Sequence, residues 1–131
     1  MITPSDIANI LYRDCKPFGI EIVPDGENLI DELDSERIVI RSKKLNSGIR
    51  WKRSFPVVNL CVPYLSDNEA YTIRLNELER QACKLLDDVV GTYDGTTYRY
   101  SIDSIGKVEE DIGLKCHYVS VTILFEVLNV K

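Results

Sequence analysis

The residue types that could perform catalysis are few in this chain, and their spacing favours a structural role. The single histidine, His117, directly follows Cys116 and could in principle act as a base beside a thiol. Consecutive side chains of a strand point to opposite faces, so we do not expect these two residues to form a dyad. Paired acids such as Asp87–Asp88 and Glu109–Glu110–Asp111 have no apparent reason to be buried, as acid–base catalysis would require. With no GxSxG, P-loop or GxGxxG motif, the sequence predicts a protein that is not an enzyme.

The cysteines do not have the spacing of a metal site. Cys15, Cys61, Cys83 and Cys116 are far apart and form no CxxC pair. A zinc site needs clustered ligands, and His117 alone cannot complete one. We therefore expect reduced and mostly buried thiols, with no metal and no cofactor.

A basic stretch is the clearest candidate for binding. Residues 41–54, RSKKLNSGIRWKRS, hold six of the 16 Lys and Arg residues and the one Trp of a chain whose net charge is −5. Such a cluster could hold phosphates and stack a base, but nucleic-acid-binding domains are usually basic overall, and residues 25–36 carry six acids. The stretch could equally be a solvated loop, or a protein-docking loop, because Arg and Trp are favoured interface anchors. The residues that would make protein contacts are Lys43, Lys44, Arg50, Trp51, Lys52 and Arg53.

Length and composition predict one ordinary globular domain over residues 1–131. Hydrophobic residues make up 44% of the chain and charged residues 28%. No apolar run approaches the roughly 20 residues of a membrane span. The N-terminal MITPSDIANILYRD has no basic region followed by an apolar one, so we expect no signal peptide and a protein kept in the cytosol.

The first half of the chain predicts a helix followed by three strands. Thr3 is a suitable N-cap, Pro4 suits the first helical position, and Pro17 and Gly19 end the helix. The strands are GIEIV, ERIVIRS and SFPVVNLCVPY, the last apolar on both faces and therefore expected inside the sheet. The basic stretch would form the extended, solvated tip of a hairpin between the second and third strands.

The second half predicts a long helix and two further strands. The helix would occupy residues 66–91, with Ser66 and Glu69 as a capping box or Asn76 and Glu79 as a second capping site, and Gly91 as its stop. YDGT (93–96) predicts a turn. The last strand has the strongest pattern, because alternate positions are apolar: Val119, Val121, Ile123, Phe125 and Val127. These elements predict an α+β fold, a mainly antiparallel β-sheet with one long helix packed across a face plus an N-terminal helix.

This order of elements resembles the tail-terminator, or tail-completion and head–tail joining, proteins of long-tailed phages and prophages. The resemblance lies in the N-terminal helix, ERIVIRS, SFPVVNLCVPY, the long helix, TTYRYSIDSIGKVEED and KCHYVSVTILFEVLN, and covers nearly the whole chain. No short invariant motif supports it, and the segment from Asp25 to Arg53 is more charged than the family pattern. The resemblance therefore also allows a neighbouring head–tail connector protein.

The resemblance implies a structural virion protein that forms a homohexameric ring on the finished tail tube. The implied partners are other copies of the chain, the tail tube protein and the head–tail connector protein, with no membrane. The implied location is the virion tail, and the host cytoplasm during assembly. Six copies would carry about −30, which would let DNA pass through the ring without specific binding. On this interpretation the basic stretch contacts protein; the alternatives are a nucleic-acid-binding accessory protein using residues 41–53 and a small enzyme.

Overall fold

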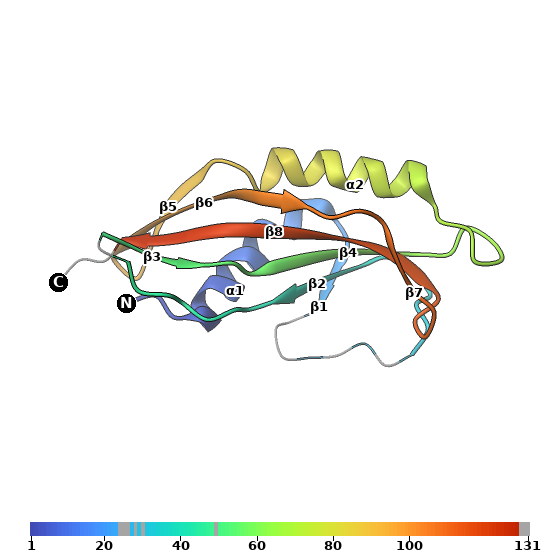
Figure 1. Ribbon diagram of the computed structural model, residues 1–131, viewed down its shortest axis with the longest axis horizontal. Coiled ribbons are helices and arrows are strands. Elements are labelled where there is room, and N and C mark those ends of the chain that lie inside the picture. Colours follow the sequence, from blue (N-terminus) through green and yellow to red (C-terminus); the bar gives the residue numbers. More distant parts are fainter. Residues whose placement is uncertain (24–26, 28, 30, 49, 129–131) are drawn as a thin grey trace.

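The long strand β8 (Cys116–Leu128) is the centre of the sheet, and four other strands pair with it. The computed structural model describes residues 1–23, 27, 29, 31–48 and 50–128. Within these residues the sheet has eight strands and the order β1-β2-β4-β8-β6-β5, with β3 and β7 also paired to β8 (Figure 1). The other strands are β1 (Glu21–Val23), β2 (Arg37–Arg41), β3 (Trp51–Ser54), β4 (Val57–Pro63), β5 (Val89–Tyr93), β6 (Thr96–Ile105) and β7 (Glu109–Asp111).

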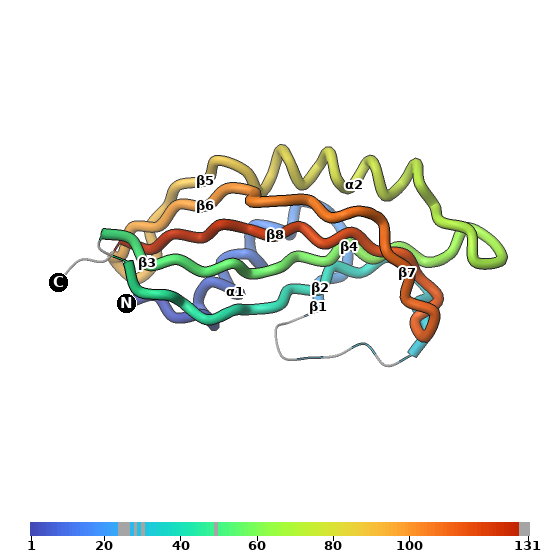
Figure 2. The backbone as a smooth tube through the Cα atoms, in the orientation of Figure 1, coloured from blue at the N-terminus to red at the C-terminus, as the bar shows by residue number. Residues whose placement is uncertain are grey.

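The predicted alternation of the last strand is confirmed. Val119, Val121, Ile123 and Phe125 are fully buried, and Val127 is 3% exposed. These side chains face the two α-helices, α1 (Pro4–Asp14) and α2 (Thr72–Leu85), and share one apolar core with them. Figure 2 shows α1 behind the strands and α2 alongside them. The opposite face of the sheet, which neither α-helix covers, is called the open face below.

The N-terminal helix begins as predicted. The Thr3 hydroxyl accepts from the Asp6 backbone at 3.2 Å, and the Asp6 carboxylate accepts from the Thr3 backbone at 2.9 Å, which completes a capping box. Ile7, Ile10 and Leu11 are buried. A short 3-10 helix, η1 (Lys16–Phe18), follows, and Gly19 turns the chain with a φ of 70°.

The α+β prediction is confirmed, but the sheet is mixed. β1 pairs with β2 in parallel, with Glu21 beside Arg37 and Val23 beside Val39. The other strand pairs of the described sheet are antiparallel. The interior position predicted for the apolar third strand is confirmed, since β4 lies between β2 and β8.

The long helix is shorter than predicted. Ser66 and Glu69 close a turn before it, with the Ser66 hydroxyl donating to Glu69 at 3.0 Å, and Asn76 lies inside the helix. At the other end Leu86 caps the helix, and Gly91 belongs to β5 rather than to a helix stop. Pairing with β6 recruits this segment into the sheet, across a turn at Asp94 and Gly95 that matches the prediction from YDGT.

The basic stretch is not simply the tip of a hairpin. Residues 51–54 form β3 and pair with the end of β8, while β4 begins at Val57. Pro56 separates the two strands because it has no backbone N–H for a ladder, although its carbonyl accepts from Ile123 at 2.9 Å.

Candidate protein interface on the open face

Strand β3 divides the predicted contact residues between two faces of the sheet. Trp51 is paired with Leu128 and Arg53 with Glu126, so both side chains lie on the open face. Lys52 is paired with Val127, whose side chain faces the core, and Lys52 lies near Met1 and Ile2 on the other side. The prediction that all six residues lie on a single solvated loop is therefore wrong.

Glu126 joins the basic stretch to a cation that sequence reasoning missed. One carboxylate oxygen lies 3.0 Å from the Arg53 Nε atom, and the other lies 2.9 Å from the Arg99 Nε atom. The Arg99 guanidinium also stacks on Trp51, 4.1 Å from the ring centroid. The sequence signal for Arg99 was its outward position in the strand of Tyr98 and Tyr100, but its pairing with Glu126 depends on the register of β6 and β8.

The carboxyl group of Glu126 is held ionised by these contacts. Its side chain is 10% exposed, and this burial by itself would raise the pKa. Hydrogen bonds from Arg99 and Arg53 outweigh burial and lower the pKa of Glu126 below its ordinary value. Two guanidiniums share this one carboxylate, so the cluster keeps an excess of positive charge.

Beside the cluster lies a hollow of about 500 Å³, called the basic hollow. Asn46 and Arg53 exchange two backbone hydrogen bonds, at 2.7 and 2.9 Å, which fold the loop back onto β3. Gly48 allows this approach, because a Cβ at that position would collide with the Trp51 carbonyl oxygen. The lining residues are Asn46, Ser47, Gly48, Arg50, Trp51, Arg53 and Phe55.

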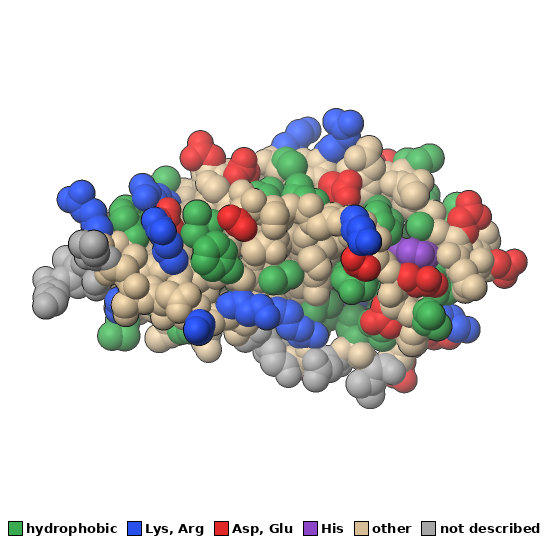
Figure 3. All heavy atoms as spheres, viewed as in Figure 1, with side chains coloured by type: hydrophobic (Ala, Val, Ile, Leu, Met, Phe, Trp, Pro, Cys, Tyr) green, Lys and Arg blue, Asp and Glu red, His purple; other side chains and the backbone are tan. Residues whose placement is uncertain are grey.

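The structure thus brings together Arg50, Trp51 and Arg53 of the predicted set. Lys43 and Lys44 are exposed in the segment between β2 and β3; the Lys43 carbonyl accepts from the Ser54 hydroxyl at 3.0 Å. Phe55, which is 40% exposed, joins the basic hollow although sequence reasoning assigned it to a buried strand. Figure 3 shows Lys and Arg side chains gathered at this end of the open face, with hydrophobic side chains between them.

A second hollow, of about 540 Å³, lies towards the other end of the molecule. Glu36 accepts from two nitrogens of Arg74, at 2.6 and 2.9 Å, and Glu77 lies 3.0 Å from the same guanidinium. The residues that line the second hollow are Gly19, Ile20, Glu21, Ser35, Glu36, Val62, Pro63, Tyr64, Leu65 and Tyr71.

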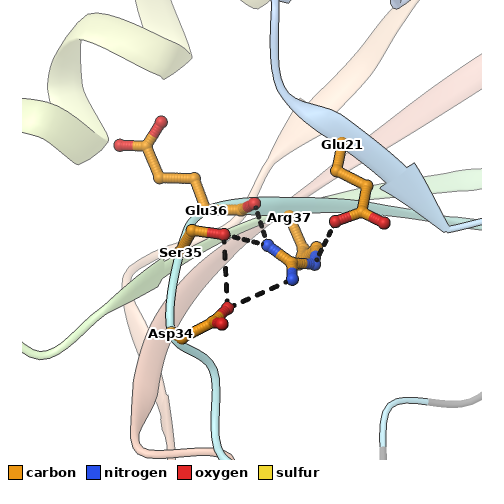
Figure 4. Close-up of polar contacts among 5 residues, drawn as sticks. All are labelled: Glu21, Asp34, Ser35, Glu36 and Arg37. Carbon is orange, nitrogen blue, oxygen red and sulfur yellow. Dashed lines mark hydrogen bonds and ion pairs between the residues drawn. The ribbon is translucent and has the colours of Figure 1, made fainter.

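Arg37 organises the acidic rim of this second hollow. Its guanidinium lies 3.0 Å from Glu21 and 3.2 Å from Asp34, and it also donates to the Ser35 hydroxyl and the Glu36 carbonyl (Figure 4). The Glu36 side chain points away from Arg37 towards α2 in the same view. Of the six acids in residues 25–36, Asp31 and Asp34 are exposed and Glu36 is half-buried, while Asp25 lies outside the described residues.

His117 and the cysteines match their predicted structural setting. Cys116 packs with Val39 and Cys61 on the open-face side, whereas His117 lies beside the Tyr64 ring, 5.2 Å between centroids. The two residues therefore do not form a dyad. Among the described residues no three His, Cys, Asp or Glu side chains are placed to hold a metal ion.

Comparisons with known proteins give this chain no relative: no family model, curated protein or solved structure matches it. In the part of the chain that the structure describes, no helix is both long and apolar enough to cross a membrane.

Proposed function

We propose that this protein is a structural component of a long-tailed phage or prophage virion, where a ring of copies caps the tail tube, ends its polymerisation and joins it to the head connector. The observation that carries the proposal is the cluster of Trp51, Arg99 and Phe55 around the basic hollow. Aromatic and Arg side chains are the usual anchors of protein interfaces. A sheet face that neither α-helix covers gives such anchors a surface on which a partner can pack.

The charge of the chain is compatible with a ring around DNA. Each copy carries −5, so a hexamer carries about −30, and a lumen of that sign would not retain a passing duplex. In this proposal the cations of the basic hollow contact the tube protein or a neighbouring copy. The oligomer would be the functional unit, and no membrane would be involved.

The experiment that tests this function is electron microscopy of particles from the parent phage or prophage with this gene deleted. We expect overlong tail tubes, or tails detached from heads, because nothing would stop the tube or join it to the connector. Tails of normal length on filled heads would reject the proposal.

A charge-reversal variant tests the role of the basic stretch in the same particles. Lys43, Lys44 and Arg50 are exposed and belong to no ion pair found among the described residues, so changing all three to Glu should leave the fold intact. We expect the same tail defect as in the deletion, with an unchanged circular dichroism spectrum. The matched control, Arg80→Glu with Lys84→Glu and Lys107→Glu, reverses three exposed cations elsewhere and should assemble normally.

A second candidate is a nucleic-acid-binding accessory protein. The observation that favours it is the stacking of Arg99 on Trp51 next to Arg50 and Arg53, which puts an aromatic surface among cations. Against it stands the acidic balance of the whole chain. Retention of the protein on immobilised DNA would separate the two candidates.

A further inference from the structure

We infer that copies of this protein bind one another head to tail, with the acidic end of one copy seated on the basic hollow of the next. The acidic end is defined as the second hollow with its ion-paired rim and the exposed apolar residues beside it, Leu65, Tyr71 and Ile73. This inference deepens the proposed function and rests on it for the closure of a ring, but it is tested on the isolated protein.

The acidic end combines apolar surface with an excess of negative charge. Four carboxylates, those of Glu21, Asp34, Glu36 and Glu77, share the guanidiniums of Arg37 and Arg74. Two negative charges are therefore left over in these networks. The neighbouring Leu65, Tyr71 and Ile73 are 52%, 40% and 71% exposed, which is a large apolar exposure for one small region.

The basic hollow has the complementary chemistry. Arg53 and Arg99 share the one carboxylate of Glu126, and the exposed Arg50 adds a further cation. Trp51 and Phe55 supply apolar walls for an aliphatic or aromatic side chain. Charges of opposite sign would orient the two copies, while the apolar contacts would supply most of the affinity.

The positions of the two surfaces determine the kind of assembly. The basic hollow lies on the open face, beside β3. The second hollow includes Val62, whose side chain belongs to the core on the helix side, and it lies where α2 begins. Figure 1 shows β3 and the start of α2 at opposite ends of the molecule.

Because the surfaces lie at opposite ends and on opposite faces, a two-fold dimer cannot make both contacts at once. Each contact leaves one free basic hollow and one free acidic end. Such a heterologous interface continues from copy to copy, and it produces a ring when the rotation closes.

Two variants that each lose one surface test the inference. Arg50→Glu with Phe55→Ser removes the basic hollow, and Glu21→Lys with Ile73→Ser removes the acidic end. All four side chains are exposed, so we expect folded proteins with unchanged circular dichroism spectra. The control, Lys84→Glu with Ile112→Ser, makes equivalent changes at exposed positions outside both surfaces.

Sedimentation velocity over a concentration series gives the readout. We expect the wild type and the control to grow beyond dimers, and each variant alone to remain a monomer. An equal mixture of the two variants should stop at a one-to-one complex, because one intact surface of each kind is present. Weakening of wild-type association by added salt is a second expected result.

The inference would be overturned by a wild type that stays monomeric at every concentration, by a variant that self-associates like the wild type, or by a mixture that forms no complex. These outcomes are separate from the fate of the proposed function. A monomeric wild type together with overlong tails in the deletion would remove the interface and keep the terminator role. Head-to-tail association together with normal tails in the deletion would keep the interface and remove the terminator role.

Discussion

Glu126 is the residue whose environment in the structure differs most from the environment that the sequence pattern predicts. Its place in the alternation of the last strand predicts a polar, solvated side chain, yet that side chain is 10% exposed. Arg53 and Arg99 close over it from the strands on either side. The carboxylate thereby holds in place Arg53, which lines the basic hollow, and Arg99, which stacks on Trp51 beside it. Burial of this charge is tolerated because each oxygen has its own guanidinium partner.

Stability should depend on pH through Glu126. The pKa of the folded carboxyl lies below the ordinary value of 4.5, so its stabilising contribution is present above pH 4.5 and is lost as the pH falls through the folded pKa. Glu126→Gln should lower the free energy of unfolding at neutral pH by about 1 kcal/mol, since its partners are half exposed. The free energy of unfolding of this variant should also decrease less as the pH falls below 4.5.

Urea unfolding at a series of pH values measures both effects. Glu109→Gln is the control, because Glu109 is an exposed carboxylate on β7 and belongs to no ion pair found among the described residues. If the free energy of unfolding of Glu126→Gln falls in acid as much as that of the wild type, this cluster contributes nothing to stability.

The cysteines should differ sharply in reactivity. Cys15, Cys61 and Cys116 are buried, and burial together with the nearby Asp14 raises the pKa of Cys15 to about 12. Cys83 is exposed on α2. We expect iodoacetamide to modify Cys83 first in the folded protein and all four thiols in urea, as measured by peptide mass spectrometry. Early modification of Cys15 would contradict the packing of α1 on the sheet.

At the scale of elements, Gly91 illustrates how tertiary pairing overrides a local signal. A glycine after an apolar helical stripe is typical of a helix end, but this one lies in β5 opposite Tyr98. A Cβ there would meet the Tyr98 hydroxyl at 2.6 Å and its ring at 2.7 Å. The Tyr98 side chain is buried and accepts a hydrogen bond from Arg13 at 2.8 Å. It therefore has little freedom to move aside.

Gly91→Ala should push β5 away from β6. We expect a loss of about 1–3 kcal/mol in the free energy of unfolding, from the cost of overpacking beside a fixed aromatic ring. Thr92→Ala, at the exposed neighbouring position, should cost much less. Thermal unfolding of the two variants measures the difference. Equal stability of both would mean that Tyr98 can turn away at no cost.

The sequence was informative where the pattern is local. The N-cap at Thr3, the turn at Asp94 and Gly95, and the alternation from Val119 to Val127 could all be predicted, because neighbouring residues determine them. The parallel pairing of β1 with β2 could not, since it joins two segments that are separated by residues 24–36 and depends on their tertiary arrangement.

The same distinction applies to the candidate site. Arg50, Trp51 and Arg53 could be selected from composition alone, because they cluster within four positions. Arg99, Glu126 and Phe55 join them through the pairing of β3 and β6 with β8, which no local pattern encodes. Lys52 lies apart from the open-face cluster, because it belongs to a strand that was not predicted and the alternation of that strand turns it to the other face.

On the scale of the whole molecule, charge is distributed unevenly along the long axis. Lys and Arg side chains gather at the β3 end and acidic side chains at the β7 end (Figure 3). The chain is acidic in total, so this polarity leaves one basic end on an acidic protein. A protein that contacts only the basic end is attracted by its positive charge. A long polyanion such as DNA is also repelled by the negative charge of the rest of the molecule. The distribution of charge therefore favours a protein partner over nucleic acid.

A column of immobilised duplex DNA distinguishes these partners. Affinity for a duplex grows with the number of phosphates that cations neutralise, and at about 0.15 M salt a few contacts on a body of net charge −5 should not retain the protein. We expect the wild type to flow through, as should the variant with Lys43, Lys44 and Arg50 changed to Glu. Retention of the wild type but not of this variant would instead support nucleic-acid binding through the basic stretch. Retention of both would place the DNA contact elsewhere on the molecule. Either kind of retention would contradict the tail-capping proposal, because that proposal requires DNA to pass through the ring without binding.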